Sequence, residues 1–254
     1  MVLAMQDKPV ALITGANKGI GLQIAKDLAA QGFFVLVGSR DLERAETAAK
    51  SVGADARAVQ LDVTDQASIA AAAERIRNEV GRLDVLVNNA AISHAGNPGR
   101  SLEEIVTTTR PSVVSLDEVR AVFETNVFGV IAVTQAMLPL LREAPTARIV
   151  NVSSRGGSLA INADPTYSNR WTFASVYSQS KTALNAITLA FSIELESAGI
   201  KVNAACPGFT ATDLNNFAGT GTVEQAAREP VRLALLDANG PTGTFSNEQG
   251  VLPW

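Results

Sequence analysis

The chain of 254 residues has a single cysteine and a single histidine. Cys206 alone cannot form a disulfide within the chain or a zinc site with several cysteines, so a reducing compartment, the cytoplasm, is expected. His94 alone disfavours a histidine-rich metal site, and we expect no metal. It also gives a serine hydrolase only one candidate base, while no G-x-S-x-G sequence supplies the nucleophile. Chemistry is therefore expected to depend on serine, tyrosine, lysine, asparagine or a bound cofactor.

Long apolar runs and basic clusters are also missing. No apolar run approaches the roughly 18 residues that suggest a membrane span, and residues 1–9 reach charged residues too early for a signal peptide. The net charge of −4 disfavours a nucleic-acid partner. A composition of 46% apolar and 18% charged residues suits a soluble protein with a sizeable core. We expect a small-molecule partner, no nucleic acid and no membrane, whereas both a monomer and a homo-oligomer stay open.

Apolar runs alternate with helical patterns along the chain. Strands are predicted at 10–15, 33–38, 57–63, 83–90, 147–154, 200–206 and about 242–246, and helices at 20–32, 41–52, 65–80, about 116–142, 174–198 and 222–237. Continuous apolar strands that alternate with helices indicate a parallel sheet covered on both faces. No repeat or linker divides the chain. The fold class is therefore predicted to be α/β, a doubly wound parallel sheet in a single domain, residues 1–254.

A glycine-rich loop follows the first predicted strand. Ligands of such sheets bind beyond the carboxyl ends of the strands. The sequence "TGANKGIG" places Gly15, Gly19 and Gly21 between a strand and a helix. Glycine there permits a tight turn and lets a phosphate reach backbone N–H groups at the positive helix end. This loop predicts a dinucleotide site, although an ordinary strand-to-helix turn would look similar.

The end of the second strand refines the cofactor. An acidic residue there would bind the ribose hydroxyls of NAD, but the sequence has Arg40, with Asp41 one residue later. A guanidinium fits a 2′-phosphate, and Lys18 in the glycine loop can add a second positive charge. NADP(H) is therefore the predicted cofactor, while Asp41 leaves use of NAD(H) open.

The segment "YSQSK" places Tyr177 and Lys181 four residues apart. This spacing brings both side chains to one face of a helix. A nearby ammonium would lower the phenol's pKa from its usual value near 10 and make it a better proton donor. The pair alone is only suggestive.

Taken together, the motifs resemble those of the short-chain dehydrogenase/reductase family, in particular its NADPH-dependent carbonyl reductases. The matching segments occur in family order: "TGANKGIG" (14–21), "LDV" (61–63), "NNAA" (88–91), "ETN" (124–126), "IVNVSS" (149–154), "YSQSK" (177–181) and "NAACPGFTAT" (203–212). "NNAA" departs from the family's common NNAG at one small residue. The resemblance covers almost the whole chain and implies a Rossmann-type sheet.

The resemblance also implies a catalytic tetrad of Asn126, Ser154, Tyr177 and Lys181, with Ser153 as a lesser alternative to Ser154. Tyr177 would donate the proton to a carbonyl oxygen, and Ser154 would hold that oxygen. Lys181 would lower the pKa of Tyr177 and bind the nicotinamide ribose. Asn126 would hold a water that links Lys181 to solvent, unless it is only a core amide that bends its helix.

Further cofactor contacts follow from the resemblance by position. The expected residues, in chain order, are Asn17, Ile20, Asp62, Val63, Asn89, Ala90, Pro207, Gly208 and Thr212. They join the three glycines, Lys18, Arg40, Tyr177 and Lys181. Cys206 and His94 also lie near this edge, and we expect packing for the first and loop surface for the second.

The spacing of 23 positions between Ser154 and Tyr177 is longer than the frequent family spacing. Some monomeric carbonyl reductases of the family also carry an insertion here, which we place at about 160–173, and a substrate loop is expected at about 207–221. The expected substrate residues are Ser154, Trp171, Phe173, Phe209, Leu214 and Phe217. An apolar pocket of this kind suits a hydrophobic ketone or aldehyde, although Trp171 could equally anchor its own loop.

The sequence thus predicts an NADPH-dependent reduction of a hydrophobic carbonyl compound. Three alternatives stay open: a 3-oxoacyl-carrier-protein reductase, a non-catalytic NADP-sensing protein and, less well supported, a sugar-nucleotide epimerase. The natural substrate is not predicted.

Overall fold

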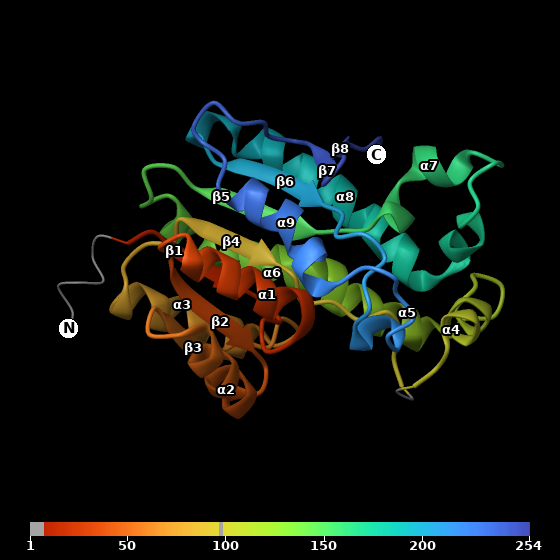
Figure 1. Ribbon diagram of the computed structural model, residues 1–254, viewed down its shortest axis with the longest axis horizontal. Coiled ribbons are helices and arrows are strands. Elements are labelled where there is room, and N and C mark those ends of the chain that lie inside the picture. The colour runs from red at the N-terminus through yellow and green to blue at the C-terminus, as the bar shows by residue number, and fades with distance from the viewer. Residues whose placement is uncertain (1–7, 97–98) are drawn as a thin grey trace.

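A computed structural model describes residues 8–96 and 99–254, and it contains one mixed sheet of eight strands (Figure 1). The strands are β1 (Val10–Ile13), β2 (Phe34–Ser39), β3 (Ala56–Gln60), β4 (Val85–Asn88), β5 (Arg148–Val152), β6 (Lys201–Ala205), β7 (Phe245–Asn247) and β8 (Gly250–Val251). Their order is β3-β2-β1-β4-β5-β6-β7-β8. All neighbours are parallel except β7 and β8. This confirms the predicted doubly wound α/β fold. Residues 1–7, most of the stretch in which no signal peptide is predicted, lie outside the described residues.

Helices cover both faces of the sheet (Figure 1). They are α1 (Gly19–Ala30), α2 (Leu42–Val52), α3 (Gln66–Glu79), α4 (Leu102–Thr108), α5 (Leu116–Phe123), α6 (Gly129–Leu141), α7 (Leu159–Ala163), α8 (Val176–Glu194) and α9 (Val223–Ala234). Short helical turns are η2 (Glu124–Phe128), η3 (Arg155–Gly157), η4 (Arg170–Ala174), η5 (Glu196–Ala198) and η6 (Asp213–Asn215). The six longest helical regions lie within a few residues of their predicted ranges. The sequence does not predict the short helices α4 and α7 or the short strand β8.

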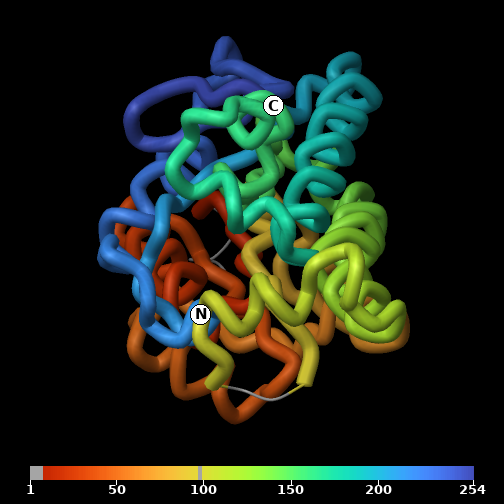
Figure 2. Tube along the Cα trace, turned by 90° about the vertical axis from the view of Figure 1, so that its right-hand side faces the viewer, coloured from red at the N-terminus to blue at the C-terminus, as the bar shows by residue number. Residues whose placement is uncertain are grey.

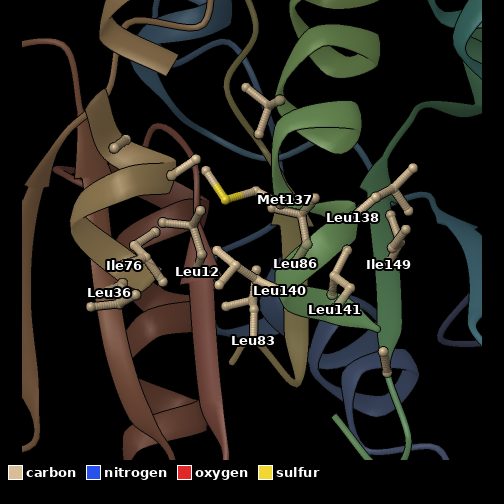
Figure 3. Packing of buried hydrophobic residues seen from close by; sticks show 14 of the residues in the cluster. Leu12, Leu36, Ile76, Leu83, Leu86, Met137, Leu138, Leu140, Leu141 and Ile149 are labelled. Carbon is tan, nitrogen blue, oxygen red and sulfur yellow. The ribbon is translucent and has the colours of Figure 1, made fainter. Parts of the chain in front are cut away.

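Two apolar layers follow from the alternation of side chains along each strand. Leu12, Leu36 and Leu86 face one layer, in which they pack with buried residues of α3 and α6 (Figure 3). The next residues along the same strands, Ile13, Val37 and Val87, face the other layer, which α1, α2 and α9 help to close. Because both faces are covered, the strands carry continuous apolar runs, and ligands have access only at the strand ends.

The predicted helix at 116–142 is continuous but not α-helical throughout. By length and composition alone, Leu116–Leu141 could cross a membrane, but its last part packs in the core beside β4, where Met137 and Leu141 are fully buried. A π-helical turn, η2, interrupts it at Asn126. There the helix approaches other strand ends so closely that a Cβ on Gly129 would lie 2.7 Å from the carbonyl oxygen of Val63. The π-helical turn therefore lies where the helix contacts the segment after β3, and the sequence pattern does not predict it.

Candidate active site

The carboxyl ends of the strands surround one elongated cavity of about 550 Å³. Figure 2 looks onto this edge, which three segments surround: the region after β4, the region between β5 and α8, and the region after β6. Cations predominate among its charged lining residues, which are Lys18, Arg40, Arg44, Arg100 and Lys181 against Asp41, Asp62 and Asp213. Three of these cations are paired with carboxylates, namely Lys18 with Asp213, Arg44 with Asp41 and Arg100 with Glu118, so Arg40 is the guanidinium most available to an anionic ligand.

The glycine loop forms one end of this cavity. Gly15 and Gly19 have φ angles of +63° and +58°, which residues with a side chain rarely adopt. A Cβ on Gly21 would lie 2.4 Å from Asn89 Nδ2, which donates hydrogen bonds to the carbonyl oxygens of Thr14 (2.9 Å) and Gly15 (3.1 Å). The loop is thus held against β4 by an asparagine side chain, and its glycines leave the backbone open to the cavity. Asn17 and Ile20 line the same end.

The end of β2 carries two arginines beside the cavity, not one. Arg40 is exposed and forms no ion pair with any described residue. Arg44, in the first turn of α2, also lines the cavity. Asp41 is already engaged, because its carboxylate accepts from the backbone N–H of Arg44 (3.1 Å) and pairs with Arg44 Nε at 3.2 Å. Arg44 is not among the site residues predicted from the sequence. Its position in the first turn of a helix that starts at this strand end could have indicated it.

Lys18 lies beside the glycine loop, but its ammonium is directed across the cavity. It pairs with Asp213 in η6 at 3.1 Å, and both side chains are more than half exposed. The region after β6 is therefore connected to the glycine loop by an exposed ion pair, which contributes at most about 1 kcal/mol. Contact of Lys18 with a cofactor phosphate stays a prediction.

Tyr177 and Lys181 lie in the first two turns of α8, which Ser175 caps by accepting from the N–H of Ser178. Both line the cavity. Lys181 Nζ donates to the carbonyl oxygen of Val152 at 2.8 Å and lies 5.6 Å from the centre of the Tyr177 ring. Helical spacing and the end of β5 together fix the phenol and the ammonium side by side.

The pKa values of this pair differ from the expectation. Burial raises the pKa of Tyr177 above its usual range, with a smaller contribution from Cys206, and a hydrogen bond with Ser154 acts in the opposite direction. Burial also lowers the pKa of Lys181 to about 7. The expected lowering of the phenol's pKa is therefore not found: burial dominates and raises the pKa. The phenol is protonated at neutral pH, so it still has a proton to donate.

Ser153 and Ser154 have different surroundings. Ser153 is 1% exposed and donates to Asn185 Oδ1 at 2.5 Å. Ser154 is half-buried, accepts from the backbone N–H of Gly156 at 3.1 Å and forms the hydrogen bond that lowers the pKa of Tyr177. The structure thus brings Ser154 next to Tyr177, although Ser153, and not Ser154, is among the residues that line the cavity. The Ser153 hydroxyl is already bonded to Asn185.

A glycine loop, a cationic cavity and the trio of Ser154, Tyr177 and Lys181 at one sheet edge agree with what known proteins show. The family model described as short chain dehydrogenase matches residues 9–222. The chain belongs to the short-chain dehydrogenase family.

Similar proteins cover nearly the whole chain. "Short-chain dehydrogenase anuI" of Penicillium roqueforti (strain FM164) is 38% identical over 241 residues, 91% of this chain and 90% of that protein. The structure of NADPH-bound carbonyl reductase from chicken fatty liver has a TM-score of 0.80 at 29% identity and covers 97% and 99% of the two chains. A 3-ketoacyl-(acyl-carrier-protein) reductase from Brucella melitensis complexed with NADH has a TM-score of 0.78 at 29% identity, with coverage of 96% and 97%.

Membership identifies the protein as an oxidoreductase that uses a nicotinamide cofactor. It also confirms the resemblance to carbonyl reductases.

Asn126 of this short-chain dehydrogenase is fully buried in η2. Its side chain accepts from the N–H of Ile92 (2.9 Å) and donates to the carbonyl oxygen of Ile92 (2.8 Å) and to Ser180 Oγ (3.0 Å). Asn126 therefore holds the segment after β4 against α8. The expected water between Lys181 and solvent stays a prediction.

Most of the other expected cofactor residues line the cavity, namely Asp62, Val63, Asn89, Ala90, Pro207 and Thr212. Gly208 lies beside the lining residues but is not one of them. Thr212 faces the glycine loop, because a Cβ on Gly19 would lie 3.7 Å from its methyl group.

The expected substrate wall differs from the structure. Leu214 lines the cavity, but Trp171, Phe173, Phe209 and Phe217 do not, and Trp171, Phe209 and Phe217 are 48%, 48% and 62% exposed. Trp171 is exposed and Phe173 is partly exposed, in the segment between β5 and α8. Their contact with substrate stays a prediction.

Three polar residues after β4 line the cavity: Ser93, His94 and Arg100. The sequence analysis expects His94 near this edge but does not predict Ser93 or Arg100. Ser93 Oγ donates to the carbonyl oxygen of Leu214 (2.6 Å) and lies 2.9 Å from His94 Nδ1, while Arg100 pairs with Glu118 at 3.2 Å. His94 lies in a loop and is partly exposed, as expected, and it also lines the cavity. Cys206 is 4% exposed, in agreement with a packing role. The described residues contain no cluster of three or more potential metal ligands.

Lys181→Met should stabilise the cofactor-free protein most at or below pH 7. The unfolded chain keeps the lysine proton up to its ordinary pKa of 10.5, but the folded protein loses it above about 7. The buried charge therefore destabilises the wild type below pH 7, by at most about 5 kcal/mol, and this destabilisation fades as the pH rises toward 10.5. Guanidinium denaturation at pH 6.5 and 9.5 measures the difference, with Lys50→Met on exposed α2 as the control. A stability difference that does not change with pH would contradict the assignment.

Proposed function

We propose that the protein reduces the carbonyl group of an apolar ketone or aldehyde to an alcohol with NADPH, and that Tyr177 is the proton donor. The observation that carries this proposal is the position of Tyr177 and Lys181 in the cavity that the glycine loop and Arg40 also line, with Ser154 hydrogen-bonded to Tyr177. The likeness to a carbonyl reductase supports it.

The residues present fit a dinucleotide. Glycines at positive φ leave backbone N–H groups free beside the start of α1, and cations exceed anions along the cavity. The nicotinamide, when bound, supplies a hydride to the carbonyl carbon. The chain's own residues would orient the carbonyl group, stabilise charge on its oxygen and protonate it.

Each member of the trio has a distinct proposed role. Ser154 accepts from Gly156 and is hydrogen-bonded to Tyr177, so its hydroxyl would hold the carbonyl oxygen beside the phenol. Tyr177 donates its proton to that oxygen, for which a buried, protonated phenol is suited. Lys181 stays next to the phenol, stabilises negative charge that develops on it and binds a ribose hydroxyl. Asn126 acts indirectly, because it fixes the backbone of Ile92 at the cavity wall.

NADPH is the proposed cofactor because of charge at the end of β2. Arg40 has no competing carboxylate among the described residues, and Arg44 brings a second guanidinium to the same cavity end. Asp41, which could have bound ribose hydroxyls, is engaged by Arg44. A 2′-phosphate would therefore meet guanidinium groups, which bind phosphate in a bidentate manner.

A second candidate, reduction of a 3-oxoacyl thioester, has specific support in the 3-ketoacyl-(acyl-carrier-protein) reductase of similar structure. NADPH consumption with a panel of aryl ketones, diketones, aldehydes and acyl thioesters separates the two candidates. Turnover of apolar ketones or aldehydes supports the proposal, and turnover of thioesters alone supports the second candidate. Tight NADPH binding without any turnover would contradict both and favour a cofactor sensor.

We further propose a cytoplasmic location and a small-molecule substrate, without nucleic-acid or membrane partners.

Ser154→Ala should lower kcat by about 10²-fold, because it removes a donor to the carbonyl oxygen. The neighbouring Ser153→Ala should leave kcat nearly unchanged but lower thermal stability, because the buried Asn185 Oδ1 loses its donor. Steady-state rates and melting temperatures of both variants test the assignment. The reverse pattern, with kcat lost in Ser153→Ala and kept in Ser154→Ala, would identify Ser153 as the catalytic serine.

A further inference from the structure

The turn that follows Ser154, residues 155–158, accepts hydrogen bonds from an asparagine in the segment between β5 and α8. Asn162, in α7, directs its Nδ2 to three carbonyl oxygens of this turn, those of Arg155 (3.2 Å), Gly156 (3.3 Å) and Ser158 (2.7 Å). A second asparagine, Asn185 of α8, donates to the remaining carbonyl oxygen, that of Gly157, at 3.3 Å. Two side-chain amides thus contact all four carbonyl groups of residues 155–158.

The same turn is pressed against the helix that carries the catalytic pair. A Cβ on Gly157 would lie 2.6 Å from the carbonyl carbon of Lys181, and a Cβ on Gly156 would lie 2.9 Å from Ser178 Oγ. The turn can therefore shift little toward α8. Its Gly156 N–H is the group that donates to Ser154 Oγ. The position of the turn consequently helps to fix the orientation of the Ser154 hydroxyl.

Asn162 is 3% exposed, and its Oδ1 has no hydrogen-bond partner within the part of the chain that the structure describes. An unpaired buried acceptor is unfavourable. The side-chain hydrogen bonds described for Asn162 are thus all donated by its Nδ2 to carbonyl oxygens of the turn. Asn162 touches neither Tyr177 nor Lys181 through any hydrogen bond of its own.

We propose that Asn162 is a positioning residue for the reaction: it fixes the 155–158 turn so that Gly156 donates to Ser154 and the Ser154 hydroxyl donates to the substrate carbonyl oxygen. This inference rests on the proposed carbonyl reduction. It gives the segment between β5 and α8 a role in catalysis that does not require substrate contact by its exposed aromatic residues. Small displacements of an orienting group reduce rates strongly. Loss of the Asn162 hydrogen bonds to the turn therefore lowers kcat more than it lowers NADPH affinity.

The test compares Asn162→Ser and Asn162→Leu with the matched control Asn169→Ser, an exposed asparagine of the same segment. Each is measured in the wild-type and the Ser154→Ala background for kcat, KM and NADPH affinity. We expect Asn162→Ser to lower kcat about 10-fold, less than the 10²–10³ that removal of an oxyanion donor costs, with NADPH affinity kept. In the Ser154→Ala background the same change should lower kcat by less than about 2-fold, since the two residues act as a unit.

Three results would overturn the positioning role. They are an unchanged kcat in both Asn162 variants, a loss that adds in full to that of Ser154→Ala, and a parallel loss of NADPH binding and folding in both variants. The proposed function is judged separately by the wild type and Ser154→Ala alone. A wild type without carbonyl turnover contradicts that function, whereas an active wild type with additive losses contradicts only the role of Asn162.

Discussion

Tyr177→Phe is expected to lower kcat by at least about 10²-fold while NADPH still binds. The substitution keeps the ring, which lies 5.6 Å from the Lys181 ammonium, and removes only the hydroxyl. The phenol is held protonated by burial and lines the cavity beside Ser154, so its loss removes the proposed proton donor without opening the site. Steady-state kinetics with an active carbonyl substrate, together with NADPH titration by fluorescence, measures both quantities.

The chain offers a matched control, because its other tyrosine, Tyr167, lies in the segment between β5 and α8 and does not line this cavity. Tyr167→Phe should leave kcat unchanged. Near-normal turnover in Tyr177→Phe would remove the phenol from the mechanism. Loss of NADPH binding in the same variant would show that the hydroxyl serves the structure of the site instead.

Arg40→Ala should raise KM for NADPH by about 10- to 150-fold and leave KM for NADH nearly unchanged, because a charged hydrogen bond contributes about 1.5–3 kcal/mol. The exposed guanidinium has no other ionic partner among the described residues, so the cofactor phosphate would be its main partner. Arg44 lines the same end, and the loss falls toward the lower limit if Arg44 substitutes for Arg40. Values of kcat/KM for both cofactors, in the wild type and the variant, give the selectivity directly.

Arg142→Ala, a change at an exposed arginine outside the cavity lining, is the control and should alter neither KM. A wild type that prefers NADH would contradict the assignment. So would an Arg40 variant that loses both cofactors equally, since a contact with the 2′-phosphate can only affect NADPH.

The elements and residues that could be predicted from sequence are those whose pattern lies within a single strand, loop or helix. Buried parallel strands tend to carry continuous apolar runs, as β1, β2 and β4 do, and the seven parallel strands lie within a few residues of their predicted ranges. The glycine loop follows a strand directly, and Tyr177 and Lys181 are neighbours by helical spacing alone. Such features need no knowledge of distant parts of the chain.

The remaining features depend on contacts between distant segments. Lys18 pairs with Asp213 only because the region after β6 folds over the glycine loop, and Ser93 reaches Leu214 for the same reason. The raised pKa of Tyr177 follows from burial, which the pair's spacing does not encode. Trp171 looks like a pocket residue because it is aromatic and near Tyr177 in sequence, but its segment leaves it half exposed.

The most direct test of the central claim uses NADPH labelled with deuterium at both C4 positions of the nicotinamide and a ketone on which the wild type is active. If the protein reduces the carbonyl group by hydride transfer, each alcohol molecule carries one deuterium on the carbinol carbon, and mass spectrometry finds one alcohol per NADPH consumed. Tyr177→Phe should form this product at least about 10²-fold more slowly. An alcohol without deuterium, or NADPH consumption without alcohol, would contradict the account.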